Sequence, residues 1–148
     1  MASAKVTLVV VTSGHSGAPT ATKIGVKEGH RVTLLGAPRA WSIEDIPSNV
    51  RVSRRRSGSQ ADVVIAFFSD AAAFERDVAS LSETVTPYGS PWIAWPRRAA
   101  GHRSDITANV VCNAVLPLGL VDVKVAVLDE DWSALKMMRR KELRHDLR

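Results

Sequence analysis

The sequence has very little cysteine. Cys112 is the only one in 148 residues, so no disulfide can form within the chain and nothing in its composition requires an oxidising compartment. Long apolar runs are also missing. The run at residues 6–11 is short and has no signal-cleavage pattern, and no stretch approaches the roughly 20 apolar residues that a membrane-spanning helix needs. We therefore expect a soluble, cytoplasmic protein with no membrane contact.

A strong excess of charge is absent too. Charged residues make up 24% of the chain and hydrophobic residues 45%, with a formal net charge of +5. These values are typical of one compact globular domain rather than a disordered chain. The basic excess is concentrated near the C-terminus, where residues 136–148 hold six basic and two acidic side chains. We expect one domain over residues 1–140 and a solvated basic tail at 141–148.

Apolar, β-branched runs bounded by turn residues predict strands. The expected strands are residues 5–12, 30–36, 50–54, 62–68 and 90–95. The run at 62–68 is apolar throughout, which is typical of a strand buried on both faces of a parallel sheet. Residues 121–127 and 132–139 flank an acidic turn and predict a closing antiparallel hairpin, with Val121, Val123 and Val125 alternating along its first strand.

Helical spacing predicts the remaining elements. A short turn of helix is expected at residues 20–24. A longer helix follows residue 68, capped by Ser69 or Asp70, and ends at a loop over residues 86–89. Another helix begins after Ser104 and stops before Gly119. Strands alternating with helices predict a Rossmann-like three-layer α/β fold, with a mostly parallel sheet and a C-terminal antiparallel hairpin.

Several segments of the chain resemble those of a known family. The chain over about residues 14–140 resembles a bacterial family of small α/β proteins, a domain of unknown function. The resemblance rests on these segments: G-x-x-G-A-P, K-I-G-V-K-E-G-H-R-V-T-L-L-G-A-P, A-D-V-V-I-A-F-F, P-W-I-A-W-P-R-R and P-L-G-L-V-D-V-K-V-A-V-L-D-E-D-W-S-A-L-K. It implies an α/β fold and brings no activity with it.

More distantly, the order of elements resembles a truncated class I S-adenosylmethionine-dependent methyltransferase, with residues 31–36 as its first strand. Two features depart from that pattern. Gly36 is followed by Ala37 and Pro38 instead of a glycine-rich turn, and proline removes a backbone donor. Residues 54–56 are three arginines where an acidic residue usually holds ribose hydroxyls, and a guanidinium cannot accept a hydrogen bond. We therefore expect no cofactor in the usual mode.

Basic side chains follow several strands at the point where each strand ends. Because ligands of parallel sheets bind outside the carboxyl ends of the strands, these loops are expected to share one basic rim, and arginine forks suit phosphate and carboxylate. Trp95 lies at the same edge and offers a ring for stacking. The candidate ligand-binding residues are Gly36, Arg39, Arg54, Arg55, Arg56, Trp95, Arg97, Arg98 and His102. The alternative is a solvated edge that aids solubility.

No catalytic or metal-binding residues stand out. The histidines have no metal-ligand spacing and there is no second cysteine. Residues 14–17 do not have the spacing of a phosphate-binding P-loop, and an ordinary turn is the simpler interpretation. Cys112 is expected on the buried side of a helix as a small hydrophobic residue, and the acidic turn at 129–131 as a surface turn.

Three hypotheses about function follow from the sequence. The first is a non-catalytic α/β module whose basic rim binds an anionic small molecule or a protein partner. The second is a reduced methyltransferase-like or nucleotide-using enzyme, and the third is a nucleic-acid-binding protein. A concave pocket with converging polar groups at the strand ends would favour an enzyme. The apolar strand at residues 5–12 leaves a homo-oligomer open as well.

Overall fold

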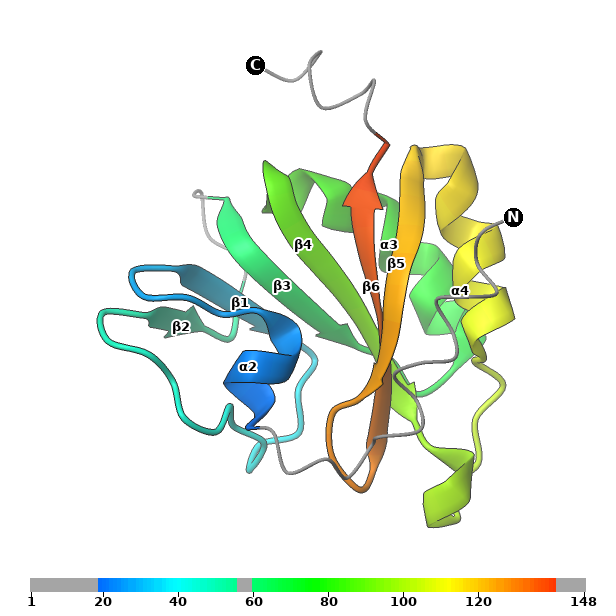
Figure 1. Cartoon of the computed structure of the whole chain (residues 1–148). Helices are drawn as coiled ribbons and strands as arrows, with labels where there is room; N and C mark the ends of the chain where they lie inside the picture. Colours follow the sequence, from blue (N-terminus) through cyan, green and yellow to red (C-terminus); the bar gives the residue numbers. More distant parts are fainter. Residues whose placement is uncertain (1–18, 56–59, 141–148) are drawn as a thin grey trace.

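The computed structural model describes residues 19–55 and 60–140 of the chain. Its centre is a six-stranded sheet with the strand order β2-β1-β3-β4-β6-β5 (Figure 1). The strands are β1 (Arg31–Leu35), β2 (Arg51–Ser53), β3 (Ala61–Phe67), β4 (Val85–Pro96), β5 (Leu120–Val127) and β6 (Trp132–Arg139). The first four run parallel to one another, whereas β6 is antiparallel to β4 and β5 is antiparallel to β6. The mostly parallel sheet and the closing hairpin predicted from the sequence are thus confirmed.

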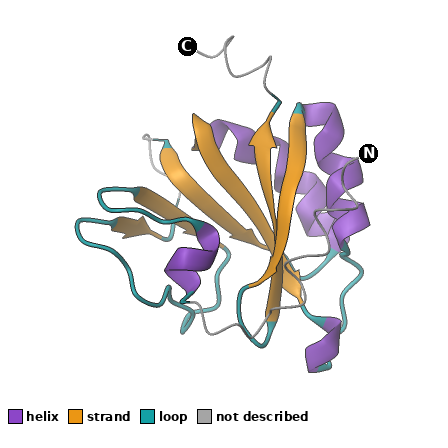
Figure 2. Ribbon diagram, in the orientation of Figure 1, coloured by secondary structure: helices purple, strands orange, loops and turns teal. Residues whose placement is uncertain are grey.

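Helices lie on both faces of the sheet (Figure 2). The short helix α2 (Thr20–Ile24) covers one face. Helices α3 (Ala71–Thr84) and α4 (Ala108–Val115) pack on the other face, and two 3₁₀ turns, η1 (Arg98–Ala100) and η2 (Leu116–Leu118), complete the described elements. We call these the α2 face and the α3 face. No helix in the described part of the chain is long and apolar enough to span a membrane.

Each face has its own core. On the α2 face, Ile24, Leu34 and Ile65 are at most 1% exposed, and Trp92 joins them. On the α3 face, helical spacing brings Phe74, Val78 and Leu81 of α3 against the sheet, as expected. Strand β3 is buried on both sides because it contributes to both cores, which is what its uninterrupted apolar run predicts.

The helix that follows β3 begins where the sequence places it. The Oδ1 atom of Asp70 accepts a hydrogen bond from the Ala73 backbone N–H at 2.9 Å, as an N-cap does. The cap of the next helix is one turn later than predicted. Thr107, rather than Ser104, caps α4 by accepting from Val110 N–H at 3.2 Å, while Ser104 accepts from Ile106 N–H in the loop before it.

Two strand details also differ from expectation. Residues 86–89, expected as a loop, lie within β4, where the pairing jumps from Ala61↔Val85 to Val63↔Ser90. The turn-forming residues are accommodated as an irregularity of a continuous strand. In β5, a register shift between Asp122 and Lys124 interrupts the predicted alternation of valines. The strand expected at residues 5–12 and the tail at 141–148 lie outside the described residues.

Candidate functional site

The carboxyl ends of β1 and β3 meet at one edge of the sheet, and Gly36 is the first residue beyond β1. Its φ of +74° suits glycine. A Cβ atom at this position would lie 2.8 Å from the carbonyl oxygen of Phe67, the last residue of β3. The sequence suggested that Gly36 lets backbone approach a ligand, but the close neighbour here is the protein's own backbone. Gly36 therefore allows the two strand ends to pack together.

Three aromatic rings fill the α2 face of this edge. Phe67 makes edge-to-face contacts with Trp41 at a centroid distance of 4.9 Å and with Trp132 at 5.0 Å. The Nε1 atom of Trp41 donates to Asp129 Oδ2 at 2.8 Å, which ties the loop after β1 to the turn between β5 and β6. Trp41 and Phe67 are both buried. We call these three rings the aromatic cluster, and it fills the space just outside the strand ends with side chains.

Arg54 closes the same edge from the side of β2. Its guanidinium donates hydrogen bonds to the backbone carbonyls of Pro38, at 3.3 Å, and of Trp41. These bonds place the loop after β1 beside the residues after β2, so that Arg39 and Arg55 flank the contact. Both are exposed, and their side chains have no hydrogen bond or ion pair with any described residue. We call Arg39, Arg54 and Arg55 the arginine corner.

The basic residues after β4 lie beside the acidic turn. Arg97 donates through Nη1 to the carbonyl oxygen of Glu130 at 2.9 Å and through its backbone N–H to the carbonyl of Asp131 at 2.8 Å. His102 Nε2 lies 2.9 Å from Asp131 Oδ1, with both side chains substantially exposed. This part of the edge is therefore mixed in charge. This mixture of charges was not predicted from the sequence, because the hairpin turn had not been assigned to this edge of the sheet.

The other predicted site residues are dispersed. Trp95 is 8% exposed and belongs to the core of the α3 face, so its ring packs inside the protein rather than standing at the edge. Arg98 is exposed in η1. Arg56 lies outside the described residues, as do residues 14–17.

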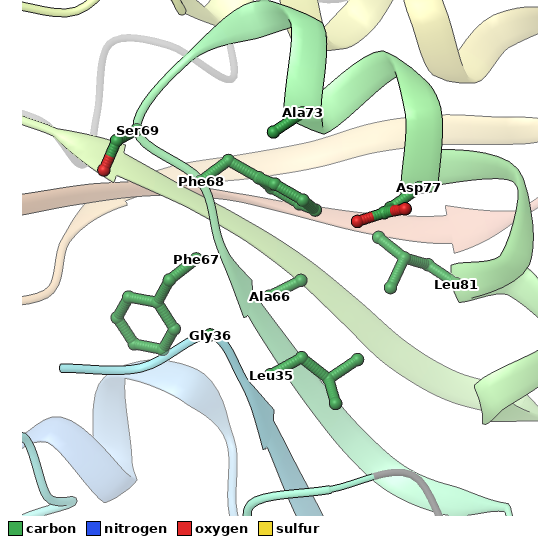
Figure 3. A pocket seen from close by; sticks show the side chains of 9 residues that line it. All are labelled: Leu35, Gly36, Ala66, Phe67, Phe68, Ser69, Ala73, Asp77 and Leu81. Atoms are coloured by element: carbon green, nitrogen blue, oxygen red, sulfur yellow. The ribbon is translucent and has the colours of Figure 1, made fainter. Parts of the chain in front are cut away.

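A pocket of about 370 Å³ opens on the α3 face of the same edge, between α3 and the ends of β1 and β3 (Figure 3). Its walls are largely apolar, and Asp77 is the one charged side chain that lines it. The lining residues are Leu35, Gly36, Ala66, Phe67, Phe68, Ser69, Ala73, Asp77 and Leu81. In Figure 3 the Phe67 ring points away from Asp77 and Leu81. The sequence did not indicate this pocket, because its lining residues come from separate segments and form no motif.

The described residues give no support for thiol or metal chemistry. Burial, followed by the nearby charge of Asp122, raises the pKa of the Cys112 thiol above its usual value, which disfavours the nucleophilic thiolate. Over residues 19–55 and 60–140, no group of three or more histidine, cysteine, aspartate or glutamate side chains could hold a metal ion.

The fold of this chain was compared with those of solved structures. The sheet is similar to an S-adenosylmethionine-dependent methyltransferase from Aquifex aeolicus, with 10% identity over 80% of this chain and 86% of that one and a TM-score of 0.53. This chain has the class I methyltransferase fold. Magnesium protoporphyrin IX methyltransferase from Synechocystis PCC 6803 also matches, at 8% identity over 80% of this chain and 78% of that one, with a TM-score of 0.53.

A third methyltransferase fold, the 1,6-didemethyltoxoflavin-N1-methyltransferase from Burkholderia thailandensis, is 10% identical over 86% of this chain and 80% of that one, with a TM-score of 0.53. No protein-family model and no curated protein sequence matches the chain. At these identities the likeness concerns the fold, and function has to be argued from the site.

Proposed function

We propose that this chain is a non-catalytic binding module built on the methyltransferase fold, and that its arginine corner binds an anionic ligand or partner. One observation carries the proposal. Arg54 is held by the carbonyls of Pro38 and Trp41, which closes the edge and leaves Arg39 and Arg55 exposed on either side. Guanidinium groups present several donors in a fixed fork, a geometry that matches phosphate and carboxylate.

The same contact argues against the usual cofactor. S-adenosylhomocysteine is bound in the Synechocystis and Burkholderia structures, according to their descriptions. Ribose hydroxyls need an acceptor beyond the second strand of such folds, whereas residues 54 and 55 here offer only donors. The aromatic cluster adds a steric obstacle, because Trp41 and Trp132 pack against Phe67 at the strand ends.

The pocket on the α3 face supports a module rather than an enzyme. An active site usually combines a concave shape with several converging polar groups. This pocket has the shape, but apolar side chains dominate its lining. Among the described residues, Asp77 has no histidine, cysteine, lysine or second carboxylate as a companion there, and Ser69 adds only a hydroxyl. General acid–base catalysis and covalent catalysis both need such companions.

The arginine corner is tested by thermal unfolding of the full chain with tripolyphosphate as a probe anion. A ligand present at 100 times its Kd raises the midpoint of a chain of this size by about 5–10 °C. We expect the double variant R39Q/R55Q to have a smaller shift than the wild type, and R76Q, an exposed arginine of α3, to keep the full shift. A shift that is unchanged in R39Q/R55Q would sink the proposal.

A reduced methyltransferase-like enzyme is the second candidate, and the position of the pocket, as distinct from its lining, favours it. Gly36 and Ser69 place the mouth of the pocket at the carboxyl ends of β1 and β3, the edge where α/β sheets bind ligands. Saturable binding of S-adenosylmethionine that is weakened at least tenfold by A73L, a variant that fills the pocket, would make this candidate the leading one. Nucleic-acid binding would instead appear as affinity that falls steeply with salt and is lost in R39Q/R55Q.

A further inference from the structure

Two lysines face each other on the closing hairpin. Lys124 of β5 and Lys136 of β6 are aligned across the antiparallel pair, so both side chains lie on the same face with Cβ atoms about 5 Å apart. Lys136 is also aligned with Trp92 of β4, which belongs to the core of the α2 face. Like charges directly opposite one another destabilise a sheet. The α2 face therefore has an unfavourable lysine pair at a half-buried position.

A third cation acts on the pair. Burial, followed by the charges of Lys124 and of Lys27, lowers the pKa of the Lys136 ammonium. Lys27 lies in the turn between α2 and β1, far from the hairpin in sequence. None of the three ammonium groups forms a hydrogen bond or ion pair with a described residue. The part of the chain that the structure describes thus supplies no carboxylate that pairs with these lysines.

A buried donor lies beside these charges. Trp92 is 1% exposed, and its Nε1 atom has no hydrogen-bond partner. A buried donor without an acceptor is costly, as is a group of like charges. An anion bound by the lysines would relieve the repulsion between them. The first 18 residues of the chain contain no aspartate or glutamate, so that segment offers no side-chain carboxylate for the purpose.

We propose that Lys124 and Lys136 form an anion site on the α2 face that binds the phosphate dianion of a small soluble ligand. Lysine binds phosphate as a compact point charge, and two lysines rising from neighbouring strands can contact different oxygens of one phosphate. Both Lys124 and Lys136 are half-buried, so part of each side chain is accessible to a small ligand. It is separate from the arginine corner, which lies at the carboxyl end of β1 and β2.

The test uses the full chain and inorganic phosphate, followed by calorimetry and thermal unfolding. We expect saturable binding, and a midpoint raised by about 5–10 °C when phosphate is at 100 times its Kd. K124M and K136M should each weaken binding at least tenfold. Without phosphate they should unfold at a higher temperature than the wild type, because one member of the repelling pair is gone. A higher unfolding temperature shows that the variants fold. Weaker phosphate binding in them can then not be attributed to lost structure.

Three controls decide the location and the source of the phosphate. R39Q/R55Q should keep a saturable site for inorganic phosphate; loss of all binding in that variant would move the site to the arginine corner and overturn the proposal. E142Q/D146N should also be unchanged; tighter binding there would mean that tail carboxylates neutralise the lysines. Binding to phosphatidic acid vesicles without binding to free phosphate would identify a membrane surface instead and contradict the proposal.

Discussion

Replacing Gly36 with alanine should destabilise the folded protein without any ligand being present. Two costs combine at this position. A left-handed φ of +74° costs an L-residue about 1–2 kcal/mol. The new Cβ would also lie 2.8 Å from the Phe67 carbonyl oxygen, and forcing packed groups apart costs typically about 1–3 kcal/mol more. We expect G36A to lower the free energy of unfolding by about 2–5 kcal/mol.

Gly29 provides the matched control. Its φ is +79°, and a Cβ there would have no atom within 4 Å. G29A therefore has the conformational cost alone, about 1–2 kcal/mol, and keeps the hydrogen bond from its N–H to the Ser48 carbonyl. Equilibrium unfolding in urea at 25 °C compares the two variants. Equal losses for G36A and G29A would refute the argument that Gly36 serves the contact with Phe67.

Three further predictions concern single contacts. W41F removes the hydrogen bond to Asp129 and should cost about 1 kcal/mol in urea unfolding; no loss would mean that this bond does not hold the loop. D70A and T107A each remove an N-cap and should each cost about 1 kcal/mol, and a loss for neither would contradict the cap assignments. Because the pKa of Cys112 is raised, the pH at which its alkylation by iodoacetamide reaches half-maximal rate should lie above that of a free thiol; a midpoint below it would be inconsistent with burial as the main cause.

Much of the fold follows from local patterns. The apolar run of β3 indicates burial on both faces, Asp70 indicates where α3 begins, and the hairpin around residues 129–131 is apparent from its turn. These features depend on residues close together in sequence, where propensity and periodicity act directly. The extension of β4 through residues 86–89 could not be predicted in this way, because the pairing of Val85 and Ser90 with β3 holds the two ends of this segment in the strand.

The candidate edge was only partly predictable. The sequence brings basic residues to the ends of parallel strands, but it does not show that Arg54 would bind the carbonyls of Pro38 and Trp41. The bond from Trp41 to Asp129 joins residues 88 positions apart, and such a contact depends on the path of a loop that has no periodic pattern. Trp95 was expected at the edge but packs in the core of the α3 face. Side chains alternate along β4, so Trp95 lies on the opposite face of the sheet from Trp92.

The central claim is that Arg54 and the aromatic cluster close the cofactor edge of this methyltransferase fold. Equilibrium binding of radiolabelled S-adenosylmethionine to the full chain tests this claim most directly. The account predicts no saturable binding up to millimolar concentration. Saturable binding in the micromolar range would contradict it, and would show that the edge opens and that the fold has kept its cofactor.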